Sequence, residues 1–187
     1  MNNIDLFGDF KPLKVKTTMQ LPLVLILDTS GSMNENIIDI NQSKISFINE
    51  NMSKFVDHIK GDFRANKISD VMIVTFGPRA MVHKTFGQLD NYVFHDLKAY
   101  GPTPLGDAMR IVLKEVDKRI MYYMENGIEY YKPKIIIMSD GAATDDYKTI
   151  AKKCSNKVNN EDIKVYPIWI GQGRYDYILK EFSPKFK

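Results

Sequence analysis

The chain has only one cysteine, Cys154, among its 187 residues, so no disulfide can form within it. A lone thiol is typical of a reducing compartment, and we expect a cytoplasmic protein. A catalytic role for Cys154 is disfavoured, because no histidine is obviously paired with it. No apolar run approaches the ~20 residues of a membrane span. The first twenty residues lack the basic start and apolar core of a secretory signal.

The sequence also lacks a strong excess of either positive or negative charge. The sequence holds 26 Lys and Arg against 23 Asp and Glu, which gives a formal net charge of +3 without a block of like charge. This balance argues against nucleic acid or a membrane surface as a partner. The hydrophobic fraction of 44% is ordinary for a globular domain.

Apolar patterning predicts alternating strands and helices. We predict strands at 21–27, 70–76, 80–86, 134–139 and 163–170, and helices at about 36–59, 104–124, 147–158 and 175–182. This order indicates an α/β fold with a doubly wound, mostly parallel central sheet, one antiparallel edge strand and helices on both faces. We expect one domain over 1–187, with an extension or edge segment at 1–20 and a core at 21–182.

Three stretches of small, oxygen-bearing residues end strands or begin helices: DTSGSM (28–33), GPTPLGDAM (101–109) and MSDGAATDD (138–146). In a parallel sheet, ligands bind beyond the carboxyl ends of the strands, so these stretches are expected to meet. Two neighbouring carboxylates repel each other, and a hard divalent cation relieves that repulsion. The sequence therefore predicts a metal site made by Asp28, Ser30, Ser32, Thr103 and Asp140.

Magnesium is the expected metal, with manganese and calcium as alternatives, because Mg²⁺ prefers oxygen ligands and keeps several waters. Zinc is disfavoured, since the three histidines show no ligand spacing. Each stretch alone has an ordinary explanation. Ser32 or Asn34 could cap a helix, and Asp140-Gly141 is a common turn dipeptide.

The combination of D-x-S-x-S, T-P-L-G and S-D-G resembles the metal-ion-dependent adhesion site of von Willebrand factor A domains. The resemblance spans about 21–182. It implies that Ser30 and Ser32 bind the metal directly, that Thr103 binds directly or through water, and that Asp28 and Asp140 act mostly through water. Within the family, VTFGPRA, GIEYYKPK and the late GQG are similar to the bacterial tellurium-resistance, TerY-like group.

That resemblance implies a protein–protein interaction module, not an enzyme, in a bacterial stress response. Its metal would capture an Asp or Glu carboxylate of a partner, with kinase-like or phosphatase-like proteins as candidate partners. The chain ends after FSPKFK, where members of the group continue, so a further strand is expected to be missing or supplied by another protein.

Two other stretches are similar to enzyme or nucleotide-binding motifs. DTSGS is similar to the nucleophile stretch of aspartyl-phosphate phosphohydrolases, with Asp28 as a magnesium-dependent nucleophile, but position 30 is not an acid and no lysine is in a recognisable context. GQGRYD (171–176) fits a turn better than a dinucleotide site. A tyrosine group at 122, 123, 130 and 131 fits either a partner surface or the cover of a helix end.

Overall fold

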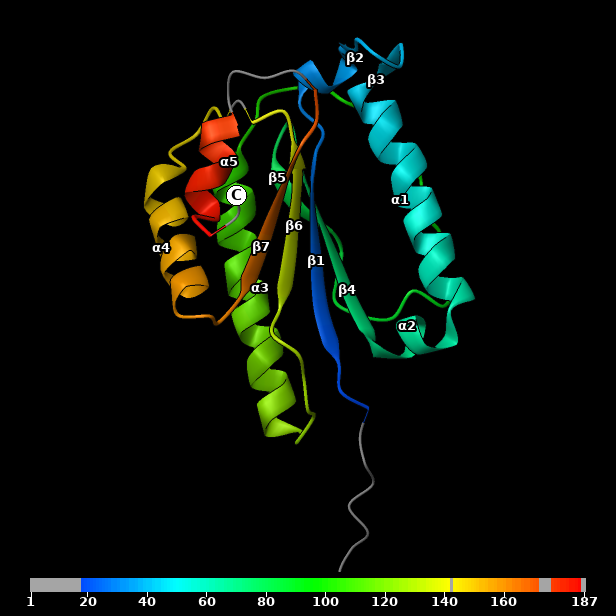
Figure 1. The fold of residues 1–187 in the computed structure, drawn as a ribbon, viewed down its shortest axis with the longest axis vertical. Coiled ribbons are helices and arrows are strands. Elements are labelled where there is room, and N and C mark those ends of the chain that lie inside the picture. The colour runs from blue at the N-terminus through cyan, green and yellow to red at the C-terminus, as the bar shows by residue number, and fades with distance from the viewer. Residues whose placement is uncertain (1–17, 142, 172–175, 186–187) are drawn as a thin grey trace, which may run out of the picture.

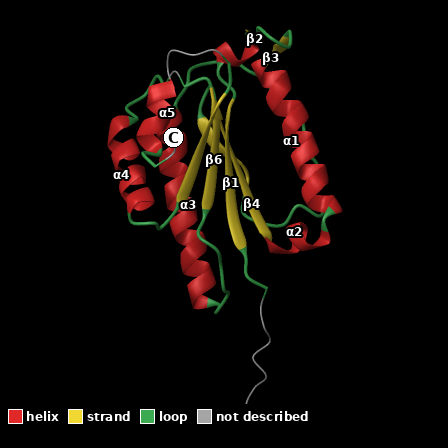
Figure 2. Ribbon diagram, in the orientation of Figure 1, coloured by secondary structure: helices red, strands yellow, loops and turns green. Residues whose placement is uncertain are grey.

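The computed structural model describes residues 18–141, 143–171 and 176–185. Five strands form the main sheet in the order β5-β4-β1-β6-β7 (Figures 1 and 2). β5 runs antiparallel to β4, and the other neighbours are parallel, which confirms the predicted fold class. The strands are β1 (Leu21–Asp28), β4 (Ser69–Phe76), β5 (Ala80–Lys84), β6 (Lys134–Ser139) and β7 (Lys164–Trp169).

Helices cover both faces of this sheet. Figure 1 shows α1 (Lys44–Gly61) and α2 (Phe63–Ile68) on one side and α3 (Leu105–Glu125), α4 (Lys148–Asn159) and α5 (Asp176–Phe182) on the other. Two apolar cores result. Leu23, Leu25 and Leu27 of β1 face the α1 core, and Val24 and Ile26 face the core under α3, α4 and α5. β1 is apolar from Leu21 to Leu27, and both of its faces are buried.

The start of the first long helix differs from the prediction of 36–59. The short strands β2 (Asn36–Ile37) and β3 (Gln42–Ser43) form a hairpin, and α1 begins only at Lys44. Ser43 caps the helix, because its side chain accepts a hydrogen bond from Ser46 N. Ile40 matched the helical spacing but is exposed in the hairpin loop, so that spacing was misleading.

A second helix, α2, was not predicted. The Asp62 side chain caps it by accepting from Arg64 N and Ala65 N. Trp169, the last residue of β7, is half-buried against the core beneath α3 to α5. The expected segment at 1–20 and the GQG turn lie mostly outside the described residues. None of the helices in the described ranges is long and apolar enough to cross a membrane.

The strand order places the candidate site. β1 pairs with β4 on one side and with β6 on the other, so strand order reverses at β1. Asp28 ends β1 and Asp140 directly follows β6, which puts both residues at the carboxyl edge of neighbouring parallel strands. Ligands of open α/β sheets bind at such a reversal point.

Candidate functional site

Asp28 is fully buried, and both of its carboxylate oxygens accept hydrogen bonds. Ser30 N donates to Oδ1 at 2.8 Å, and the Ser139 hydroxyl donates to Oδ2 at 2.5 Å. Burial raises the pKa of Asp28 to about 6; the bonds from Ser139 and Ser30 act against this rise, and the charge of Asp140 adds to it. The negative charge of Asp28 is therefore held in a place where a nearby cation would stabilise it.

The two predicted serines lie together beyond β1, in and beside the 3-10 helix η1 (Gly31–Asn34). The hydroxyl oxygens of Ser30 and Ser32 are 3.1 Å apart. Gly31 N donates to Gly101 O at 2.9 Å, which ties this loop to the loop before α3. Gly101 has φ +81°, and a Cβ there would lie 2.9 Å from the backbone of Pro78, so glycine is required where this loop passes the turn after β4.

Thr103 lies in that second loop and is buried. Its backbone is held from two directions, because Thr103 N donates to Thr144 Oγ1 at 2.9 Å and Thr144 N donates to Thr103 O at 3.0 Å. Pro104 follows it and restricts Thr103 to extended conformations. The loop before α3 is therefore anchored both to the Ser30 loop and to the loop after β6.

Asp140 is buried, with a relative exposure of 7%. Its two oxygens differ in their surroundings. Oδ2 accepts from Lys44 Nζ at 3.1 Å, whereas Oδ1 is buried and has no hydrogen-bond partner among the described residues. A buried carboxylate oxygen without a donor is unfavourable unless a ligand, an ion or water completes it.

Sequence reasoning missed two residues of this group, Ser139 and Lys44. Ser139 is the last residue of β6, and its contact with Asp28 depends on β1 and β6 being neighbours. Lys44 is the first residue of α1, and the helix predicted from residue 36 concealed that position. One local signal marks Lys44 as unusual. It directly follows Ser43, a good capping residue, and the first turn of a helix favours acidic side chains over basic ones.

The donor set fits a hard cation. It consists of three hydroxyls and two carboxylates, which are the oxygen ligands that Mg²⁺ and Mn²⁺ accept. Among residues 18–141, 143–171 and 176–185, no cluster of three or more His, Cys, Asp or Glu side chains could hold a metal. A cation at this edge would therefore depend on the hydroxyls of Ser30, Ser32 and Thr103 as well as on Asp28 and Asp140.

Two other features that the sequence singled out are structural. Cys154 is buried, and burial raises its pKa to about 12, so the reactive thiolate is scarce at neutral pH. Tyr123 is buried as well; its hydroxyl donates to Asp70, and its ring stacks on Tyr130 with centroids 5.3 Å apart. Tyr122 is about half exposed, so only part of the tyrosine group is available to a partner.

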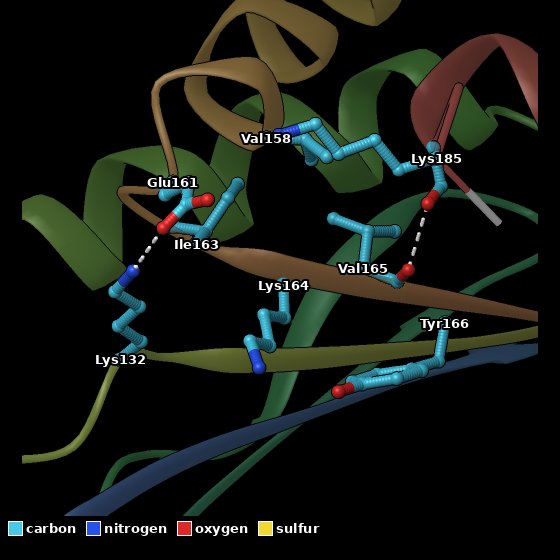
Figure 3. Close-up of a pocket in the computed structure, with 9 residues that line it drawn as sticks. Lys132, Val158, Glu161, Ile163, Lys164, Val165, Tyr166 and Lys185 are labelled. Atoms are coloured by element: carbon cyan, nitrogen blue, oxygen red, sulfur yellow. Dashed lines mark hydrogen bonds and ion pairs between the residues drawn. The ribbon is translucent and has the colours of Figure 1, made fainter.

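A separate cavity of about 270 Å³ lies beside β7 (Figure 3). Lys132, which precedes β6, forms an ion pair with Glu161, which precedes β7, at 2.8 Å. Ser183 Oγ donates to Val165 O at 2.8 Å. The ion pair lies at the amino ends of β6 and β7, whereas Asp28 and Asp140 lie at the carboxyl ends of β1 and β6. This part of the cavity is therefore at the opposite end of the strands from the candidate site. The lining is Lys132, Val158, Glu161, Ile163, Lys164, Val165, Tyr166, Ser183 and Lys185.

Solved structures share this fold at low sequence identity. The manganese-loaded TRAP protein of Plasmodium vivax has a TM-score of 0.62 at 18% identity, covering 91% of this chain and 65% of that one. BatB of Bacteroides thetaiotaomicron has a TM-score of 0.56 at 15% identity, covering 88% and 85%. The ArnB paralog VWA2 of Sulfolobus acidocaldarius has a TM-score of 0.53 at 20% identity, covering 90% and 40%. The chain thus spans less than two thirds of the TRAP structure.

Comparison with curated protein sequences finds no significant match. The model of the von Willebrand factor type A domain, in contrast, matches residues 23–142, which is more than half of the chain. The matched segment begins in β1 and ends after β6, so it contains all five residues of the candidate site. The chain belongs to the von Willebrand factor type A domain family.

Proposed function

We propose that the chain is a divalent-cation-dependent protein interaction module, with a site made by Asp28, Ser30, Ser32, Thr103 and Asp140. The observation that carries the proposal is the convergence of three distant loops at one edge of the sheet. The Gly31–Gly101 and Ser139–Asp28 hydrogen bonds join these loops, and the unpartnered Oδ1 of Asp140 lies at the same edge.

The chemistry of the donors supports capture of an anion. Three of the five donors are neutral hydroxyls, which offset less of a cation's charge than carboxylates would. A bound Mg²⁺ or Mn²⁺ supplies an electrophilic centre that attracts an oxygen anion. The Asp or Glu side chain of a partner protein is the anion that we propose. The chain's own residues would hold the cation in place, and most of them are buried.

Two further features of the proposal rest on likeness to other proteins. The TRAP structure that shares this fold is described as manganese-loaded, which supports a divalent cation here. The motifs VTFGPRA and GIEYYKPK support a bacterial stress-response system of the tellurium-resistance type, with kinase-like or phosphatase-like partners. We propose no catalytic activity for the module.

Calorimetric titration of the purified protein with MgCl₂ and MnCl₂ tests the metal site. We expect one site in the wild-type chain and at least a ~100-fold loss of affinity in Asp28→Ala with Ser30→Ala, since two of the five oxygen donors are removed. Asp57→Ala, an exposed acid on α1, is the matched control and should bind as the wild type does. Equal affinity in all three proteins would refute the site.

Affinity capture from a bacterial lysate tests the partner. A protein recovered with magnesium, lost in EDTA and not recovered by the Asp28→Ala, Ser30→Ala chain would support carboxylate capture. Replacing one acidic residue of that partner should reproduce the effect of EDTA. A partner that binds equally well in EDTA would contradict a role for the metal in recognition.

The second candidate function is a phosphohydrolase that uses Asp28 as its nucleophile. The position of Lys44 favours it. We expected no lysine near the site, yet Lys44 Nζ lies 3.1 Å from Asp140 Oδ2, where it could neutralise a phosphoryl group. Against it, Asp28 is fully buried and both of its oxygens already accept hydrogen bonds. Release of phosphate from an aryl phosphate or ATP, abolished by Asp28→Asn, would favour this alternative.

A further inference from the structure

The ammonium group of Lys44 lies inside the proposed site. Nζ lies 2.8 Å from Glu35 Oε2, 3.1 Å from Asp140 Oδ2 and 3.4 Å from Ser32 O. Two of these three acceptors belong to residues of the proposed metal site, Ser32 and Asp140. The Lys44 side chain is only 9% exposed, so these oxygens replace most of the water that an ammonium ordinarily keeps.

The position of Lys44 in α1 does not favour a positive charge there. Lys44 is the first residue of α1, where the helix dipole is positive and disfavours a cation. The carboxylates of Glu35 and Asp140 instead accept hydrogen bonds from the ammonium and offset the cost of burying its charge.

The loop after β7 accommodates this side chain. Gly171 has φ +110°, and a Cβ at that position would lie 2.9 Å from Cε of Lys44. A side chain at residue 171 would push the lysine away from Asp140 or be strained itself. The hydrogen bonds, the burial and the glycine together indicate that the surrounding residues hold the ammonium in a fixed position at this edge of the sheet.

We propose that Lys44 is the resident cation of this site: its ammonium neutralises Asp140 when no metal is bound, and it competes with a divalent cation for that negative charge. The inference rests on the metal site of the proposed function. Without Lys44, Asp140 would lose the ammonium group that its Oδ2 contacts. With Lys44, part of the negative charge at this edge is already offset, although the ammonium is shared with Glu35, so less electrostatic attraction remains for a metal.

The competition predicts opposite effects on the metal-free and metal-bound protein. Lys44→Met keeps an unbranched side chain that is one atom shorter and removes its charge. We expect Mg²⁺ and Mn²⁺ to bind Lys44→Met at least about tenfold more tightly than wild type in calorimetric titration. In EDTA the variant should unfold at a lower temperature, because Asp140 is left buried without its cation. Saturating magnesium should raise the unfolding temperature of the variant more than that of the wild type.

Lys54→Met is the matched control, because Lys54 is an exposed lysine of the same helix that pairs with Glu50. Its metal affinity should stay within about twofold of wild type, since solvent screens a distant surface charge. Lys44→Gln is a second neutral variant in case the methionine impairs folding. A neutral variant that folds only with magnesium present would agree with the proposal. If neither variant folds with or without metal, Lys44 serves the fold and the competition is rejected.

The outcomes separate this inference from the proposed function. If wild type binds metal but both neutral variants bind it equally or more weakly, Lys44 does not compete and only the inference is wrong. If wild type, the Asp28→Ala, Ser30→Ala chain and Lys44→Met all lack specific metal binding, the proposed metal site is itself wrong. Tighter binding in the neutral variants, with Lys54→Met unchanged, would support both.

Discussion

The Ser139 hydroxyl donates a 2.5 Å hydrogen bond to Oδ2 of Asp28, across 111 residues of sequence. The bond links the carboxyl ends of β6 and β1, the two strands at which strand order reverses. Ser139 Oγ also accepts from Gly141 N at 2.9 Å, so the same hydroxyl fixes the turn that carries Asp140. One small side chain therefore sets the position of both candidate carboxylates.

Ser139→Ala should destabilise the metal-free protein by about 1.5 to 3 kcal/mol, because a buried carboxylate loses a hydrogen-bond donor. Denaturant unfolding in EDTA measures this loss. Ser53→Ala, an exposed serine on α1, is the control and should change the free energy of unfolding by less than about 0.5 kcal/mol. Equal unfolding curves for the two variants would show that the Ser139–Asp28 bond contributes little.

Stability of the metal-free protein should depend on pH through Asp28. Its pKa is about 6 in the folded protein against the ordinary aspartate value of 3.8, so the folded state binds this proton more tightly than the unfolded chain does. The group therefore adds stability below about pH 4 that is lost as pH rises to 6, by up to about 3 kcal/mol. Asp28→Asn should lack this loss when unfolding is compared between pH 4 and pH 7. If the free energy of unfolding changed with pH in the same way in wild type and in Asp28→Asn, the raised pKa of Asp28 would be contradicted.

Thr103→Ala should weaken magnesium binding and capture of a carboxylate partner, with the larger effect on the partner. The two serines and two aspartates still hold the metal, whereas Thr103 is the donor most suited to exchange between direct and water-mediated contact. Thr103→Ser keeps the hydroxyl and should behave as wild type within about twofold. Calorimetry with magnesium and then with the captured partner measures both effects. A serine variant as defective as the alanine variant would show that the threonine methyl, not the hydroxyl, matters.

Tyr123→Phe should destabilise the fold without altering metal affinity. The Tyr123 hydroxyl donates to Asp70, a buried carboxylate that also accepts from Arg119 at 2.6 Å. Loss of this donor should lower the free energy of unfolding by about 1 to 3 kcal/mol. Tyr122→Phe, a neighbouring half-exposed tyrosine, is the matched control and should unfold as the wild type does. A change in magnesium affinity in Tyr123→Phe would contradict a purely structural role.

Much of the fold was predictable because its strands are unusually clear. The apolar run of β1 and the wholly buried β4 indicated strands enclosed on both faces, and alternation with helices then implied a parallel sheet. Parallel strands end at the same edge, so the approach of Asp28 and Asp140 followed from element order alone. Pro104 likewise marked the beginning of α3, which starts at Leu105.

The rest depended on tertiary contacts that no local pattern encodes. Ser139 reaches Asp28 because β6 lies beside β1 in the sheet. The hairpin before α1 places Lys44 at the amino end of the helix, and the lack of a side chain at Gly171 leaves room for its ammonium beside Asp140. Ile37 and Ile40 had the spacing of a helix face, yet Asn41 with φ +47° turns the chain into a hairpin instead.

β1 is the first strand along the described chain, yet it lies in the middle of the sheet. Its register partners begin at Ser69 on one side and at Lys134 on the other. During synthesis, β1 therefore leaves the ribosome long before either neighbour exists, with an apolar segment that has no strand to pair with. A nascent chain interrupted before β6 exposes one whole edge of that segment, which is a template for aggregation. Unfinished chains of this protein should consequently depend on chaperones until Ser139 has been added.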